Sequence, residues 1–177
     1  SLRVHRAGYH TRAELESELA WIDALRADRS VDIPAPLEVS HGGHIASFEL
    51  DGGTRDVVAF EFMPGEEPST EDDLVPGFGR LGAINARLHA HARAWTRPSN
   101  FVRKTWDFAT TVGPRPLWGD WRAGIGLTED GQAVLERCTD ALRARLAAYG
   151  TGADRFGLVH ADLRLANLLI DETGHIG

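Results

Sequence analysis

Three polar residues near the end of the chain, His160, Asp162 and Asn167, have the spacing H-x-D-x-x-x-x-N. Apolar residues bracket them, with Leu158-Val159 before and Leu168-Leu169-Ile170 after. Phosphoryl transfer requires a positioned acceptor hydroxyl and metal ions that neutralise phosphate charge. An aspartate can accept the hydroxyl proton, and an asparagine five residues later can reach a magnesium ion from the same loop. The pattern therefore predicts a kinase catalytic loop, whereas a bare H-x-D would indicate a surface turn.

With these residues the sequence resembles the phosphotransferase family of aminoglycoside phosphotransferases, choline and ethanolamine kinases and type II homoserine kinases, whose members share the protein-kinase-like fold. The resemblance is strongest to the type II homoserine kinase-like branch. It implies that Asp162 is the catalytic base, that Asn167 is a magnesium ligand and that His160 braces the loop. It also implies a phosphate role for Arg164, which lies where many kinases have a lysine. ATP and Mg²⁺ are the implied cofactors.

The family also carries a basic residue on an early strand, paired with a glutamate on the next helix, that contacts the ATP phosphates. Arg3 within Leu2-Arg3-Val4, followed by Glu18, fits this plan, with arginine in place of the usual lysine. Arginine keeps the charge, although its planar fork binds differently. The alternative is an exposed strand arginine and a glutamate on a solvated helix face.

The segment Phe60-Glu61-Phe62-Met63-Pro64-Gly65 corresponds to the hinge of this fold, where adenine hydrogen-bonds to the backbone. The resemblance places these contacts around Glu61 and Met63. The alternative is an ordinary strand end.

Apolar periodicity and turn residues predict the elements that position these groups. We expect a strand at residues 2–6 and a helix at 11–27, with a capping box between Thr11 and Glu14. A hairpin is expected from strands 45–50 and 57–62, joined by a turn at 51–53 that is longer than the ideal two residues. Two further helices are expected at about 70–93 and 128–149, with these apolar residues facing inward: Leu74, Phe78, Leu81, Ile84 and Leu88 on the first, and Val134, Leu135, Cys138, Ala141, Leu142 and Leu146 on the second.

These elements define an α+β chain, which the resemblance identifies as a protein-kinase-like two-lobe fold present as a fragment. Residues 1–63 are expected to form a partial N-terminal lobe, and residues 64–177 a partial C-terminal lobe with the catalytic loop. The glycine-rich loop is expected before Arg3, and a second metal-binding aspartate after the return strand that begins at His175-Ile176. The chain lacks an initiator methionine, and these 177 residues alone are not expected to turn over substrate.

Other polar and aromatic groups have simpler interpretations. His89 and His91 lie two apart, so on a helix they point to different faces and are interpreted as structural rather than as metal ligands. The tryptophans between Trp95 and Trp121 are expected mainly to pack, with a site for an amine-bearing acceptor as the minority interpretation. The acidic residues Glu66, Glu67, Glu71, Asp72 and Asp73 are interpreted as a solvated helix start, with amine binding as the minority alternative.

Composition excludes several classes of function. A net charge of −7 argues against nucleic-acid binding, which needs a basic surface. The single cysteine, Cys138, excludes an internal disulfide and a cysteine-based zinc cluster, and favours a cytoplasmic setting. No apolar run approaches the ~20 residues of a membrane span, and no signal-peptide pattern is present at the amino terminus.

The favoured hypothesis is an ATP-dependent kinase that phosphorylates a hydroxyl group of a small molecule. The alternatives are a non-catalytic nucleotide-binding or interaction module (a pseudokinase) and a bacterial stress-type protein-serine kinase. Homoserine, choline, an aminoglycoside or a similar alcohol all fit as acceptors, and the choice between ATP and GTP and the oligomeric state stay open.

Overall fold

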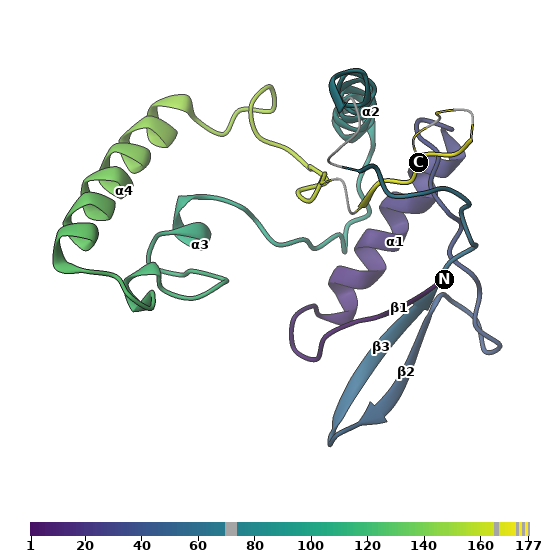
Figure 1. The fold of residues 1–177 in the computed structure, drawn as a ribbon. Helices are drawn as coiled ribbons and strands as arrows, with labels where there is room; N and C mark the ends of the chain where they lie inside the picture. Colours follow the sequence, from purple (N-terminus) through teal and green to yellow (C-terminus); the bar gives the residue numbers. More distant parts are fainter. Residues whose placement is uncertain (70–73, 165–166, 173, 175, 177) are drawn as a thin grey trace. The chain divides into compact units, whose positions relative to one another are not determined.

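The computed structural model describes residues 1–69, 74–164, 167–172, 174 and 176 (Figure 1). The chain divides into two compact units, which are described separately: Ser1–Arg103 with Gly157–Gly177, and Lys104–Phe156. The first unit contains β1 (Leu2–Val4), α1 (Arg12–Ala27), β2 (Ile45–Leu50), β3 (Gly53–Ala59) and α2 (Leu74–Ala94); the second contains α3 (Phe108–Thr111), the short 3₁₀ helix η1 (Trp121–Ala123) and α4 (Glu129–Tyr149). The expected lobe boundary between residues 63 and 64 stays a prediction.

The three strands form an antiparallel sheet in the order β1-β3-β2. Leu50 pairs with Gly53, so the hairpin turn consists of only Asp51 and Gly52, and the expectation of a longer turn is wrong. Both turn residues have positive φ, 51° and 74°, as a two-residue type I′ turn requires. The Asp-Gly dipeptide is therefore the turn itself.

Because the turn is tight, β3 begins at Gly53 rather than at Val57, and its first half is polar. Thr54 Oγ1 donates to Glu49 Oε1 at 2.6 Å, and Ser47 Oγ donates to Asp56 Oδ1 at 2.6 Å. Such cross-strand polar pairs lack the apolar alternation on which the sequence prediction depended. The strand ends at Ala59, and Phe60, which follows it, forms an isolated bridge to Pro36 and exchanges hydrogen bonds with Ser1.

Helix α1 begins directly after Thr11, and the predicted capping box is confirmed. The Glu14 backbone N–H donates to Thr11 Oγ1 at 3.2 Å, and the Thr11 N–H donates to the Glu14 carboxylate at 2.8 Å. Leu15 and Leu19 of α1 form a buried cluster with Ile45 of β2 and Val58 of β3. Figure 1 shows α1 beside the sheet, and this cluster joins the two.

Helix α2 packs on α1 through Trp21, Leu25, Leu88 and Ala92. Its beginning was expected at Thr70, which with residues 71–73 lies outside the described part of the chain. Pro76 lies in the first turn of α2, where a missing N–H costs no helical hydrogen bond. Phe78 is 52% exposed, so its predicted burial is wrong. The buried face of α2 starts about one turn later, at Leu81, which packs against Leu168 and Ile176.

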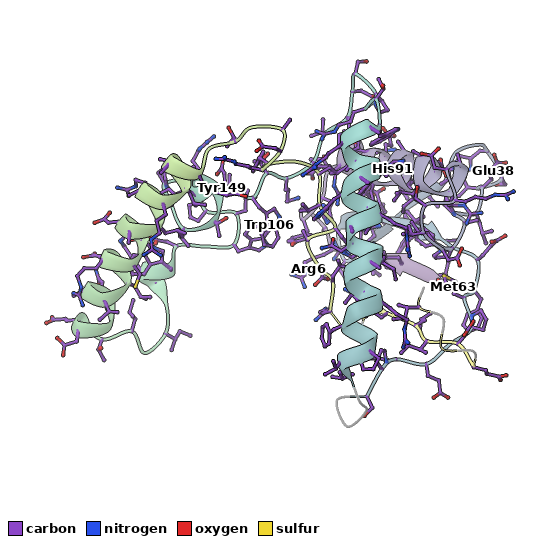
Figure 2. The ribbon with its side chains drawn as sticks, turned by 90° about the horizontal axis from the view of Figure 1, so that it is seen from above. Arg6, Glu38, Met63, His91, Trp106 and Tyr149 are labelled. Atoms are coloured by element: carbon purple, nitrogen blue, oxygen red, sulfur yellow. The ribbon has the colours of Figure 1, made fainter. Side chains whose placement is uncertain are left out.

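His91 on α2 is buried, and its structural interpretation is confirmed (Figure 2). Trp21 Nε1–H donates to His91 Nδ1 at 3.2 Å, and His91 Nε2 lies 3.4 Å from Asp28 Oδ2. Nδ1 of His91 therefore accepts a hydrogen bond from α1, and the ring links α1 to α2. His89 is half-buried on the same helix, and its bracing role stays a prediction.

In the second unit, α4 begins after its N-cap Thr128, as predicted, but its apolar face is not buried. Val134, Leu135, Leu142 and Leu146 are 40–47% exposed, so the predicted inward face is wrong for this helix as described. Helix α3, which contacts α4, has four residues, too few to cover the face of a 21-residue helix. The rings of Trp106, labelled in Figure 2, and Trp118 lie 4.6 Å apart.

Candidate active site

The segment 158–170, called here the loop 158–170, is held by its apolar ends, although residues 165 and 166 within it lie outside the described part. Leu158 packs with the α1–α2 cluster. Leu163 and Leu168 pack with Leu81 of α2 and with Ile176. The apolar residues that bracket the polar motif therefore anchor it to α2.

Asp162 and Asn167 meet within this loop. Asn167 Nδ2 donates to Asp162 Oδ2 at 2.8 Å and to the Asp162 carbonyl at 2.9 Å. The other carboxylate oxygen of Asp162, Oδ1, lies 3.4 Å from Nε of Arg164. The five-residue spacing thus closes the loop on itself and fixes the direction of the Asp162 carboxylate. The side chains of Asp162, Arg164 and Asn167 are all exposed.

His160 supports the backbone of the loop. The Asp162 N–H donates to His160 Nδ1 at 3.3 Å, a contact that requires a deprotonated Nδ1. Partial withdrawal from water lowers the pKa of His160; the Arg103 and Arg3 charges also lower it, against the opposing effect of Asp162 and Glu18. The neutral ring that braces the loop is thereby favoured, which supports a bracing role over a reactive one.

The structure forms the ion pair that the sequence suggested between β1 and α1. Arg3 Nη1 lies 2.8 Å from Glu18 Oε1. Burial, the largest effect, acts to raise the pKa of Glu18, but the charges of Arg3 and Arg103 and the hydrogen bond from Arg103 outweigh it and lower this pKa. Glu18 is therefore held as a carboxylate. The contact with ATP that the resemblance assigns to this pair stays a prediction.

Sequence reasoning missed Arg103, which holds the other oxygen of Glu18. Arg103 Nη1 donates to Glu18 Oε2 at 3.0 Å. The residue lies in a stretch without helical or strand periodicity, 85 positions from its partner. No local signal in the sequence identifies a contact of this kind.

The hinge segment follows β3. The Glu61 N–H donates to the Ala35 carbonyl at 2.9 Å, so this amide is engaged within the protein. The adenine contact of Glu61 stays a prediction, and its carbonyl oxygen is the backbone group that could make it. Met63, labelled in Figure 2, is half-buried, and its predicted adenine contact stays a prediction.

Gly65 connects the hinge to the loop 158–170. Glu66 and Ile170 exchange two backbone hydrogen bonds, each 2.9 Å, immediately after this glycine. Gly65 has φ of +143°, and a Cβ placed there would lie 3.0 Å from Leu169 Cβ and 3.1 Å from the Ile170 carbonyl oxygen. The position therefore needs glycine, for its conformation and for the close approach of the two segments.

We expect Gly65→Ala to lower the free energy of unfolding of the full-length protein by about 1–3 kcal/mol, because of backbone strain and the contact with Ile170. Urea denaturation measures this loss. Gly79→Ala is the matched control: nothing lies within 4 Å of its added Cβ, and α2 should tolerate or gain from alanine. Equal stability of Gly65→Ala and wild type would contradict the assigned role.

The role of Asn167 as a magnesium ligand stays a prediction, and the structure shows one oxygen of the type it needs. The two hydrogen bonds from Asn167 Nδ2 to Asp162 leave the amide oxygen Oδ1 as the group for a cation, and Mg²⁺ prefers oxygen ligands. Within the described residues no cluster of three or more His, Cys, Asp or Glu side chains is placed to hold a metal. The arrangement fits an ion held jointly with nucleotide phosphates, as in kinases.

Stability should depend on pH through Glu18. Its pKa in the folded state is lowered, so its ion pairs stabilise the protein above the ordinary glutamate value of 4.5 and are lost as pH falls through the folded pKa. The difference in unfolding free energy between wild type and Glu18→Gln should be constant near neutral pH and shrink below that value. Urea denaturation at a series of pH values measures it, and a difference that grows on acidification would refute the ion pairing.

A three-stranded antiparallel sheet, a helix whose glutamate pairs with a strand arginine, and a loop with apposed Asp and Asn agree with the protein-kinase-like fold that the sequence resemblance predicts. A comparison with known proteins leads to the same fold and family. Residues 1–177 match the phosphotransferase enzyme family (APH), and the chain belongs to that family. This confirms the resemblance found in the sequence.

Individual relatives are similar over most of the chain. An uncharacterised protein of Deinococcus radiodurans is 31% identical over 182 aligned positions, which cover 99% of this chain and 48% of that protein. An uncharacterised protein of Synechocystis is 32% identical over 98 positions, which cover 55% of this chain and 26% of that protein.

Two solved structures share the fold. A microcompartment-associated aminopropanol kinase has a TM-score of 0.88 and 44% identity, covering 97% of this chain and 53% of that one. An amicoumacin kinase in complex with AMP-PNP and Ca²⁺ has a TM-score of 0.73 and 22% identity, covering 99% of this chain and 49% of that one. The expected α+β kinase-like fold is confirmed, and the chain spans about half the length of these kinases. No helix among the described residues combines the length and apolarity needed to cross a bilayer.

Proposed function

We propose that the full-length protein transfers the γ-phosphate of ATP to a hydroxyl group of a small molecule. The observation that carries this proposal is the contact between Asp162 and Asn167, which presents one carboxylate and one amide oxygen from a single exposed loop. The ion pair of Arg3 with Glu18 and membership of the phosphotransferase family support it.

Each residue then has a defined task. Asp162 accepts the proton of the acceptor hydroxyl as the oxygen attacks the γ-phosphorus, the bond from that phosphorus to the β,γ-bridging oxygen breaks, and ADP leaves. The direction of the Asp162 carboxylate is fixed by Asn167. Arg164, at 3.4 Å from the Asp162 carboxylate, provides positive charge beside the transferred group. Arg3 binds the phosphates of ATP, oriented by Glu18. Asn167 Oδ1 would bind Mg²⁺, which when present neutralises phosphate charge. The backbone around Glu61 and Met63 would bind adenine.

A small amino alcohol is the first acceptor to test. The structurally similar protein at 44% identity is an aminopropanol kinase, and the net charge of −7 suits a cationic acceptor. ADP release by the full-length protein, measured with amino alcohols, homoserine, choline, aminoglycosides and a protein substrate, identifies the acceptor class. Stimulation by small hydroxyl compounds is expected. Stimulation by the protein substrate alone would instead favour the protein-serine kinase alternative.

A further inference from the structure

Arg103 is one of three charged groups in contact, Arg3, Glu18 and Arg103, which are called here the arginine–glutamate triad. Each guanidinium binds a different oxygen of the one carboxylate, Arg3 on Oε1 at 2.8 Å and Arg103 on Oε2 at 3.0 Å. With both oxygens engaged, the Glu18 carboxylate cannot rotate without breaking a charge-assisted hydrogen bond. The position of the Arg3 guanidinium therefore depends on Arg103.

Arg103 is itself held on α1 by neighbouring contacts. Its Nη1 also donates to the Glu14 carbonyl at 3.3 Å. The preceding Val102 N–H donates to Ser17 Oγ at 2.8 Å, and that buried hydroxyl donates in turn to the Ala13 carbonyl at 2.7 Å. The segment after α2 is thus fixed along α1, and a part-buried guanidinium in such a setting loses little side-chain freedom on binding its carboxylate.

The charge of the triad also differs from that of a simple pair. One arginine and one glutamate cancel, whereas two arginines and one glutamate leave a net positive charge. The Arg3 side chain is the more exposed of the two arginines, at 56% against 30% for Arg103. An anionic ligand would therefore meet Arg3, while Arg103 sustains the positive potential and the geometry behind it.

We propose that Arg103 is a positioning residue for the phosphates of the bound nucleotide, acting through Glu18 on Arg3. This inference rests on the proposed function, because it takes the ligand of Arg3 to be a nucleoside triphosphate. Arg103 contacts the Glu18 carboxylate, and its proposed effect on the ligand is exerted through that contact.

Nucleotide binding by the full-length protein tests this role without requiring turnover. In Arg103→Gln, the Kd for AMP-PNP with Mg²⁺, measured by titration calorimetry, should rise about tenfold, while the Kd for adenosine should change less than about twofold. Arg97→Gln is the matched control, since Arg97 is an exposed arginine of the same segment that lies over the Phe101 ring. It should bind both ligands as wild type does.

A double-mutant cycle separates the outcomes. In a Glu18→Gln background, Arg103→Gln should add less than about twofold to the Kd for AMP-PNP. A tenfold rise in Kd that persists there would overturn the role through Glu18. Equal losses of affinity for AMP-PNP and adenosine would show a merely structural role and overturn the proposal.

If Arg103→Gln does not fold, Arg103→Lys is the second variant. It should weaken AMP-PNP binding about threefold and leave adenosine binding unchanged; wild-type affinity of Arg103→Lys for AMP-PNP would overturn the proposal. Wild-type protein that binds no AMP-PNP would refute the proposed function itself.

Discussion

Asp162→Asn in the full-length protein should reduce phosphotransfer about 10²–10⁴-fold, the range for loss of a positioned general base. An amide cannot accept the proton of the acceptor hydroxyl. Its carbonyl oxygen can still accept the hydrogen bond from Asn167 Nδ2 that now reaches Asp162 Oδ2 at 2.8 Å, so the loop 158–170 should keep its shape. The rate of ADP formation at saturating ATP and acceptor measures the loss, which should appear in kcat.

Asp23→Asn is the control for this variant, because Asp23 is an exposed aspartate of α1. It should retain the wild-type rate. The affinity of Asp162→Asn for AMP-PNP should stay within a few-fold of wild type, since the adenine and phosphate contacts are assigned to other residues. Near-normal turnover by Asp162→Asn would remove this residue from the role of base.

Asn167→Ala should lower activity about 10–100-fold at limiting Mg²⁺, the scale on which metal sites respond to lost partners. Two effects contribute. The variant loses the amide oxygen assigned to the cation, and it loses both hydrogen bonds that hold Asp162. The rate as a function of Mg²⁺ concentration separates them: excess Mg²⁺ should restore the metal-dependent part and leave the loss of positioning.

Asn167→Asp keeps an oxygen ligand and should require less Mg²⁺ than Asn167→Ala. Asn100→Ala, which alters an exposed asparagine in the turn after α2, should leave the Mg²⁺ dependence unchanged. An Asn167→Ala variant with the Mg²⁺ dependence of wild type would contradict the assignment of Asn167 as the metal ligand.

Local signals predicted the parts of the fold that depend on local physics. The capping box of Thr11 and Glu14, the strand Ile45–Leu50 and the start of α4 close to Thr128 are decided by residues a few positions apart. The motif of the loop 158–170 was likewise readable, because its spacing brings Asn167 onto Asp162. The roles of these site residues stay predictions.

The features that the sequence did not predict depend on tertiary contacts, or on whether a glycine belongs to a turn or to the following strand. Arg103 binds Glu18 across 85 positions of sequence, and no periodic pattern predicts a contact at that separation. Phe78 and the apolar residues of α4 satisfy helical periodicity, but periodicity marks an apolar face without saying what covers it. The sequence predicts too long a hairpin turn because Gly53 is a typical turn residue, although in the structure it pairs with Leu50.

Direct observation of the product tests the central claim. The full-length protein, ATP, Mg²⁺ and a panel of small hydroxyl compounds led by amino alcohols can be followed by ³¹P NMR, with Asp162→Asn as the parallel control. We predict that a phosphate monoester resonance and ADP appear together for at least one compound, and only with wild-type protein. Nucleotide binding without any such ester would contradict phosphotransfer to a small molecule and favour a non-catalytic nucleotide-binding module.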